Sequence, residues 1–229
     1  MRKLGLVGGT GPESTVPYYR KIVYGVRERT GSFPPLVIES VDVFQVLDFC
    51  GRKDYDSLLT YLLRAVESLA AAGAERAALT GNTPHIVFPE LQARSPIPLV
   101  SMPEAASLEA QRLGMKRLLL LGTRFTMRED FFKQPFRDRG MEILIPEPVE
   151  QVWIDQKISK ELELGVVRPE TQSTMDHIIR CWQEKGADAA VLGCTELPML
   201  YEDRPGPLPL LDTMAAHIRT LIDWIVEND

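Results

Sequence analysis

The sequence predicts an α/β protein built from two similar halves, each with a parallel sheet. Short apolar runs alternate with longer stretches of helical spacing, which is typical of strands buried in parallel sheets. Two pairs of segments also repeat along the chain at one common ungapped offset. The chain has 229 residues, of which 45% are hydrophobic, and this is enough for one large core or two small ones.

The apolar runs are the predicted strands. Each run is short and consists mainly of Leu, Val, Ile or Ala, as a strand covered on both faces requires. The runs are residues 4–7, 36–38, 77–79, 118–121 and 189–192. Helical spacing is clearest in residues 58–72 and 171–186. In such a fold the loops at the carboxyl ends of the strands bind ligands.

The internal repeat has an offset of 113 residues. Residues 3–10 align with residues 116–123, and residues 73–79 align with residues 186–192. Because both matches share one offset, they indicate two similar α/β halves related by a pseudo-twofold axis.

The repeat also predicts domain boundaries. We expect the first domain to comprise residues 1–99 and 211–229, with a C-terminal helix that begins near Thr213. The second domain is expected to comprise residues 100–210. A cleft between two such domains is a common place for an active site, and we expect the site there.

Charge and composition argue for a small soluble substrate. The net charge is −6, and Lys and Arg are scattered among acidic residues, so nucleic acid and anionic membranes are not expected partners. No run approaches the length of a membrane span, and the apolar start is too short for a signal peptide, so a cytoplasmic protein is expected. The three cysteines and three histidines are too widely spaced for a disulfide framework or a metal site.

Cys194 is the predicted centre of the chemistry. It follows a predicted strand and precedes a helix start, where backbone N–H groups favour a thiolate that could move a proton at neutral pH. The alternative interpretation is a buried, inert thiol, which is what we expect of Cys50 and Cys181. The offset places Gly81 where the first half would hold the counterpart of Cys194.

Short polar residues at the strand ends are candidates for substrate binding, because their hydroxyl, amide and backbone groups can hold a carboxylate. The candidates are Thr10, Asn82, Thr83, Thr123, Thr126 and Thr195. Each of them could instead cap a helix or form a turn. The run from Gly9 to Ser14 partly imitates a dinucleotide fingerprint, but Ser14 replaces its third glycine, so no cofactor is predicted.

Several motifs together resemble the aspartate/glutamate racemase family over the whole chain. They are Gly8-Gly9-Thr10-Gly11-Pro12-Glu13-Ser14-Thr15, Gly81-Asn82-Thr83-Pro84-His85, Gly122-Thr123-Arg124-Phe125-Thr126, Gly193-Cys194-Thr195-Glu196 and Asp212-Thr213. The resemblance implies two Rossmann-like domains. It also implies an isomerase that is independent of pyridoxal phosphate, acts on an amino acid such as aspartate or glutamate, and is frequently a homodimer. It also implies two acid/base residues that flank the substrate α-carbon, with Cys194 as one of them. Family position further favours Arg52 and Arg168 as cations for a side-chain carboxylate.

Gly81 departs from the family pattern. The residue before Asn-Thr is usually Cys in the family and in some members Thr, whereas glycine has no group that could move a proton. Three hypotheses follow. In the first, the protein is a racemase or epimerase in which another group, such as Thr80, Thr83, His85 or a water, acts on the face of the substrate next to Gly81. In the second, Cys194 alone runs a one-sided reaction, as in the related arylmalonate decarboxylases. In the third, the protein binds an amino acid or dicarboxylate without turnover.

Overall fold

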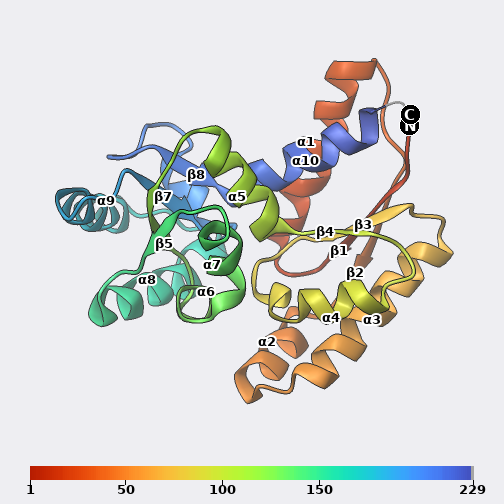
Figure 1. Cartoon of the computed structure of the whole chain (residues 1–229), viewed down its shortest axis with the longest axis horizontal. Helices are drawn as coiled ribbons and strands as arrows, with labels where there is room; N and C mark the ends of the chain where they lie inside the picture. Colours follow the sequence, from red (N-terminus) through yellow and green to blue (C-terminus); the bar gives the residue numbers. More distant parts are fainter. Residues whose placement is uncertain (228–229) are drawn as a thin grey trace. The chain divides into compact units, whose positions relative to one another are not determined.

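Two four-stranded parallel sheets form the framework of the protein (Figure 1). The computed structural model describes residues 1–227, apart from the side chains of residues 12 and 13. The strand orders are β2-β1-β3-β4 and β6-β5-β7-β8, so both sheets have the same topology. The chain divides into two compact units, Met1–Met102 with His217–Asp229 and Pro103–Ala216. The predicted fold class, α/β with two parallel sheets, is confirmed.

The first unit is built on β1, whose five residues are all buried. Its strands are β1 (Leu4–Gly8), β2 (Leu36–Ser40), β3 (Arg76–Leu79) and β4 (Leu99–Val100). Its helices are α1 (Pro12–Thr30), α2 (Val43–Arg52), α3 (Tyr55–Ala71), η1 (Thr83–Val87), α4 (Phe88–Arg94) and the larger part of α10 (Thr213–Val226). The apolar stripe of α3 packs on β1 and β2, and a Cβ at Gly5 would lie only 3.1 Å from Leu69, so glycine allows this close packing.

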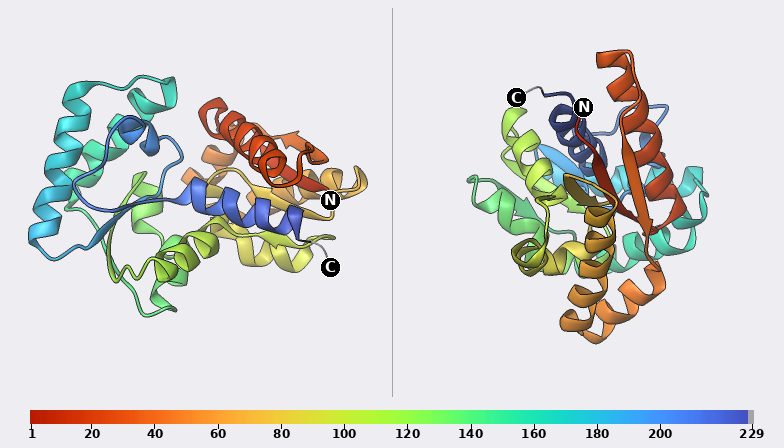
Figure 2. Two further views of the ribbon diagram at one scale, coloured as in Figure 1. Left: turned by 90° about the horizontal axis from the view of Figure 1, so that it is seen from above. Right: turned by 90° about the vertical axis from the view of Figure 1, so that its right-hand side faces the viewer.

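The larger part of the final helix belongs to the first unit. From His217 onward α10 lies beside α1, which Figure 2 shows in two views. A Cβ at Gly25 would lie 2.5 Å from Ile222 Cδ1, and Arg29 of α1 forms an ion pair with Asp223 of α10. Because Gly25 has no side chain, α1 and α10 can approach each other closely.

The second unit has strands β5 (Arg117–Leu121), β6 (Glu142–Leu144), β7 (Ala189–Leu192) and β8 (Leu210–Asp212). Its helices are α5 (Met102–Arg112), α6 (Arg124–Arg128), α7 (Asp130–Arg137), α8 (Pro148–Lys160), η2 (Leu162–Leu164), α9 (Pro169–Glu184) and η3 (Leu197–Tyr201). Side chains of β5 alternate between two cores, with Leu119 in one together with Ile179 and Leu118 in the other together with Phe132. Because both faces are covered, the strand reads as one apolar run.

The offset of 113 residues is confirmed by the strands themselves. β1 begins at Leu4 and β5 at Arg117, and β3 and β7 begin at residues with the same separation. The pairing register differs by one residue, however, because Val7 pairs with Leu79 whereas Leu121 pairs with Leu192. When the two units are aligned by this pairing register, Gly9 corresponds to Thr123. Thr10 then lies one residue further along the loop after β1.

The unit boundaries lie a few residues later than the sequence boundaries. β8 pairs with β7 through Leu192 and Asp212, so residues 211–216 belong to the second unit and not to the first. Residues 100–102 continue from β4 and stay with the first unit. Residues 228 and 229, at the end of the predicted first domain, lie outside the described residues. Within the described chain, no helix is long and apolar enough to cross a membrane.

Candidate active site

Cys194 forms a thiol–carboxylate pair with Glu196 at the carboxyl end of β7. The Cys194 thiol donates to Glu196 Oε2 at 2.9 Å, and the same oxygen accepts from the Thr195 hydroxyl at 3.0 Å. Glu196 is buried, with 5% of its surface exposed, whereas Cys194 is half-buried. A carboxylate held this way can take the thiol proton.

Two glycines determine the backbone position of Cys194. Gly193 N donates to Leu121 O at 2.7 Å, and a Cβ on Gly193 would lie 2.9 Å from that same oxygen. A Cβ on Gly122 would lie 3.3 Å from Gly193 O. The loops after β5 and β7 therefore approach each other backbone to backbone, and a side chain would clash at Gly193 and be tightly packed at Gly122.

The surroundings of Cys194 raise the pKa of its thiol well above the ordinary value. Burial is the main cause, followed by the charge of Glu196 and the hydrogen bond to it, and Glu163 acts in the same direction. The sequence predicted the opposite, a thiolate favoured by a helix start. That prediction is corrected, because the following helix η3 has only five residues and a carboxylate lies beside the sulfur.

Further carboxylates surround this strand end. Burial raises the pKa of Glu163, and the charges of Glu196 and Asp155 raise it further. Asp155 accepts from Arg124 N at 2.8 Å and lies 3.3 Å from Arg124 Nε. The end of the second sheet is therefore acidic, and Arg124, its nearby cation, already has a carboxylate partner.

At the carboxyl end of the first sheet, the space beside Gly81 is filled by Thr10. An ideal Cβ on Gly81 would lie 3.1 Å from Thr10 Oγ1, 3.2 Å from Thr10 Cβ and 3.4 Å from Thr10 Cγ2. Thr10 follows β1 and Gly81 follows β3, and these strands are neighbours in the sheet. The space that a side chain at position 81 would use is thus occupied by a hydroxyl-bearing side chain from another loop.

Thr10 belongs to a cluster of hydroxyls. Thr10 Oγ1 lies 3.0 Å from Thr80 Oγ1, which donates to Val7 O at 3.1 Å. Ser14 Oγ donates to Thr80 O at 2.7 Å, and Thr15 Oγ1 accepts from Gly9 N at 3.0 Å. Thr80 and Ser14 have no exposed surface, whereas Thr10 is half-buried.

His85 uses both of its ring nitrogens on the backbone. Its Nε2 accepts from Met102 N at 3.1 Å, so the proton is on Nδ1, which donates to Gly81 O at 2.9 Å. Burial lowers the pKa of His85 to about 4. This histidine shapes the loop at Gly81 as a neutral ring, and neither nitrogen is available to shuttle a proton.

The remaining predicted residues divide between the two sheet ends and the helix termini. Asn82 is buried beside Gly81, and Thr83 begins η1 half-buried. In the second unit Thr123 caps α6 by accepting from Thr126 N at 3.3 Å, while Thr126 and Thr195 are buried.

The two predicted cations take part in local ion pairs. Arg52 Nη2 lies 2.6 Å from Asp48 on the same helix, and Arg168 Nε lies 3.7 Å from Glu161. Both arginine side chains are about 60% exposed, at 58% and 61%. Glu196 is the residue that sequence reasoning missed, although it stands two positions after Cys194 in the same motif.

The other cysteines differ from Cys194 in their contacts. Cys50 is buried in α2, and burial raises the pKa of its thiol to about 11. Cys181 lies on α9 with its sulfur 3.6 Å from His177 Nε2. Over the described residues, no group of three His, Cys, Asp or Glu side chains could hold a metal ion.

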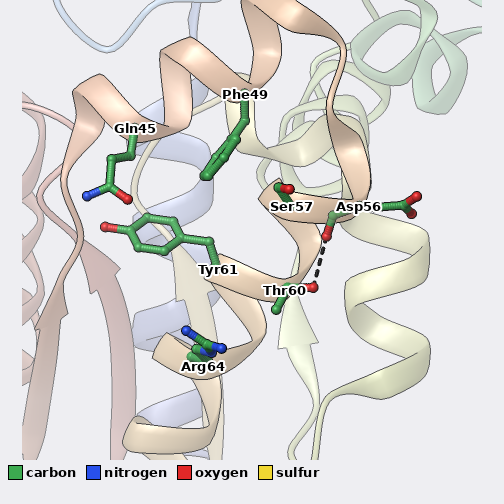
Figure 3. Close-up of a pocket in the computed structure, with 7 residues that line it drawn as sticks. All are labelled: Gln45, Phe49, Asp56, Ser57, Thr60, Tyr61 and Arg64. Carbon is green, nitrogen blue, oxygen red and sulfur yellow. Dashed lines mark hydrogen bonds between the residues drawn. The ribbon is translucent and has the colours of Figure 1, made fainter.

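A groove of about 370 Å³ lies elsewhere, between α2 and α3 (Figure 3). It is lined by Gln45, Tyr61 and Arg64 among others, and the hydroxyl of Thr60 on its wall donates to the Asp56 carbonyl at 2.9 Å. None of the predicted site residues lines it, so the strand ends remain the candidate active site.

The fold and the sequence of this chain are both similar to those of known amino-acid racemases. The two parallel sheets of identical strand order match the two-domain α/β fold of solved Asp/Glu racemase structures. The chain belongs to the Asp/Glu/hydantoin racemase family, which it matches over residues 7–221.

Three individual proteins show the range of similarity. A crystal structure of an aspartate racemase homologue from Pyrococcus horikoshii OT3 is 31% identical, covers 99% of this chain and 100% of its own, and has a TM-score of 0.86. A broad-specificity amino-acid racemase of Bacillus subtilis (strain 168) is 22% identical over 230 residues, 96% of each chain. An arylmalonate decarboxylase shares the fold alone, with 12% identity, a TM-score of 0.57 and coverage of 99% and 94%.

Proposed function

We propose that this protein is an amino-acid racemase or epimerase that needs no cofactor and uses Cys194 to move the α-proton of aspartate, glutamate or a related amino acid. The observation that carries the proposal is the 2.9 Å contact between the Cys194 thiol and Glu196, in a chain that belongs to the Asp/Glu/hydantoin racemase family. A thiol that is hydrogen-bonded to a buried carboxylate can act as a general acid or base.

The chemistry begins with transfer of the thiol proton to Glu196. The resulting thiolate takes the proton from one face of the substrate α-carbon, and a group on the opposite face delivers a proton to the carbanion. The raised pKa of Cys194 makes the thiolate a strong base once it forms, which suits the weakly acidic α-proton. Glu196 acts through Cys194 and is a positioning residue, held as an acceptor by the Thr195 hydroxyl.

Substrate binding is proposed to use the short polar residues that follow the strands. Hydroxyl, amide and backbone N–H groups there can hold the α-carboxylate, and Arg52 and Arg168 are proposed to meet a side-chain carboxylate. The polar residues proposed are Thr10, Asn82, Thr83, Thr123, Thr126 and Thr195. The family resemblance also leads us to propose a cytoplasmic homodimer, which light scattering and cell fractionation would test.

A one-sided reaction is the second candidate. Gly81 carries no acid/base side chain, and His85 is committed to the backbone through both nitrogens. In that case Cys194 would exchange or deliver a proton on one face only, as a decarboxylase of a substituted malonate would require.

Proton NMR in heavy water distinguishes the two candidates. The wild-type protein is incubated with L- and D-aspartate and glutamate, beside Cys194→Ala and the matched control Cys181→Ala, which changes a cysteine on α9. A racemase exchanges the α-proton and builds up the opposite enantiomer, and loses this with Cys194→Ala only. Exchange of one enantiomer without inversion, or loss of carbon dioxide from a substituted malonate, supports the one-sided reaction. Binding without any exchange refutes both.

A further inference from the structure

Glu163 is an exposed carboxylate on η2, in the same unit as Cys194. The residues proposed above for substrate binding hold carboxylates, and none of them is an anion that could pair with the amino group of an amino acid. We propose that Glu163 binds the α-ammonium group of the substrate beside Cys194. This inference rests on the proposed racemase function and adds a binding residue to it.

The core of the second unit holds η2 near the Cys194 thiol. Leu162, which directly precedes Glu163, is fully buried in a hydrophobic cluster, and Cys194 packs against the same cluster. The charge of Glu163 raises the pKa of the Cys194 thiol, and the charge of Glu196 raises the pKa of Glu163. Glu163 therefore lies within electrostatic range of both the sulfur and its carboxylate partner.

The carboxylate of Glu163 has no partner among the described residues, neither a hydrogen-bond donor nor an ion-pair cation. Two cations that flank η2 are paired with Glu161 instead. Lys157 Nζ lies 2.5 Å from Glu161 Oε1, and Arg168 Nε lies 3.7 Å from the same oxygen. Glu161 is buried and also accepts from the Thr171 hydroxyl at 2.5 Å. Glu163 is thus left available for a cation that comes from outside the protein.

The α-carbon of an amino acid carries both the proton that Cys194 removes and the ammonium group. The ammonium group therefore comes close to the sulfur whenever the proton is in position for transfer. Two other carboxylates at this strand end are already engaged, because Glu196 is bonded to the thiol and Asp155 is paired with an arginine. Glu163 remains as the carboxylate that can accept hydrogen bonds from the ammonium group.

Ammonium binding at Glu163 also favours formation of the Cys194 thiolate. In the free protein the negative charge of Glu163 keeps the pKa of the thiol high. An ammonium group that is paired with Glu163 offsets this charge, so the pKa of the thiol falls when the substrate is bound. Transfer of the thiol proton to Glu196 then becomes easier. The same contact thus selects an amino acid over an analogue without an amino group, and it prepares the base for the reaction.

Isothermal titration calorimetry tests the binding role with two matched pairs of ligands. Succinate is aspartate without its amino group, and glutarate is glutamate without its amino group. The wild type should bind each amino acid about 10-fold more tightly than its analogue, which corresponds to one charge-assisted hydrogen bond. Glu163→Gln should reduce this preference to about 2-fold or less and should not weaken the binding of succinate and glutarate, because only the ammonium group makes the lost contact.

Two further variants separate charge from packing. Glu163→Asp keeps the charge and should retain at least part of the preference. Glu184→Gln, which changes an exposed glutamate of α9 in the same unit, is the matched control and should leave the preference unchanged.

A second measurement needs no ligand. In a background without Cys50 and Cys181, Glu163→Gln should shift the alkylation of Cys194 by iodoacetamide to lower pH, because a charge that raises the pKa of the thiol is removed. An unshifted profile would show that Glu163 lies outside electrostatic range of the sulfur and would overturn the proposal.

The outcomes distinguish this proposal from the proposed function. If the wild type inverts aspartate or glutamate and Glu163→Gln keeps the preference for the amino acid, Glu163 does not bind the ammonium group and the racemase function stands. Equal losses for the amino acids and their analogues would likewise overturn the role of Glu163, because they indicate a structural effect. If the preference depends on Glu163 but the wild type inverts nothing, the racemase function fails and the binding role stands. If the wild type binds neither amino acid, both proposals fail.

Discussion

Two buried histidines should make the first unit sensitive to acid. Burial lowers the pKa of His85 to about 4, and burial together with the nearby His85 lowers the pKa of His217 to about 3. His217 is held by Tyr18 Oη at 2.7 Å and by Val100 O at 3.1 Å. Both rings are therefore neutral in the folded protein, whereas the unfolded chain takes up a proton on each near pH 6.5.

The sign and size follow from proton linkage. Below pH 6.5 the unfolded chain binds more protons than the folded one, so stability is complete above pH 6.5 and falls as the pH drops toward 4. Each pH unit in this window costs about 1.4 kcal/mol per histidine. Between pH 7 and pH 5 each histidine should cost about 2 kcal/mol, and the pair about 4 kcal/mol.

Urea unfolding at several pH values between 7 and 5 measures this effect, with fluorescence of Trp224 as the reporter of the first unit. To isolate that signal, Trp153 and Trp182 of the second unit are replaced by phenylalanine. His217→Gln should reduce the loss to about half, because one titrating group is gone. His177→Gln, which changes an exposed ring on α9, is the control and should keep the full loss. An equal loss of stability in wild type and His217→Gln would refute the reasoning.

Three further predictions concern single contacts. Glu196→Gln removes the carboxylate beside the thiol and should lower the pKa of Cys194 below that of the wild type. The dependence of the iodoacetamide alkylation rate on pH, in a background without Cys50 and Cys181, measures this pKa. An unchanged pH profile would contradict the thiol–carboxylate pair. Gly9→Ala should destabilise the first unit by about 2 kcal/mol or more, because φ is +81° and the new Cβ would lie 2.1 Å from Val41 O. Gly31→Ala, with φ of +76° and open space, should cost only about 1 kcal/mol in the same urea titration, and equal costs would show that the contact with Val41 relaxes. Arg204→Met removes the arginine that lies 2.6 Å from the buried Asp176 carboxylate and should lower the free energy of unfolding by about 3 kcal/mol. Arg180 is exposed and lies 3.8 Å from the same carboxylate, so Arg180→Met should lower it by less than about 1 kcal/mol. Similar losses for the two variants would refute the role assigned to burial.

Four of the five strands that the sequence predicted are buried on both faces, and the fifth, β2, is a partly exposed edge strand. Residues 118–121 and 189–192 were identified as strands because every side chain there is apolar, and β5 and β7 confirm them. The edge strand β6 was not predicted, because its three residues are only partly covered and include a glutamate. Pattern alone cannot identify so short and mixed a segment as a strand.

The sequence by itself determined the duplicated α/β architecture, the resemblance to a racemase family and the central place of Cys194 in the proposed chemistry. These follow from apolar periodicity, a constant offset and motif order, which are properties of the chain as written. Only the tertiary structure decided that Glu196 raises the pKa of that thiol, and that Thr10 fills the space beside Gly81. Both depend on distances of about 3 Å between side chains whose positions are set by loops and sheet register, and the sequence encodes those distances only through the fold.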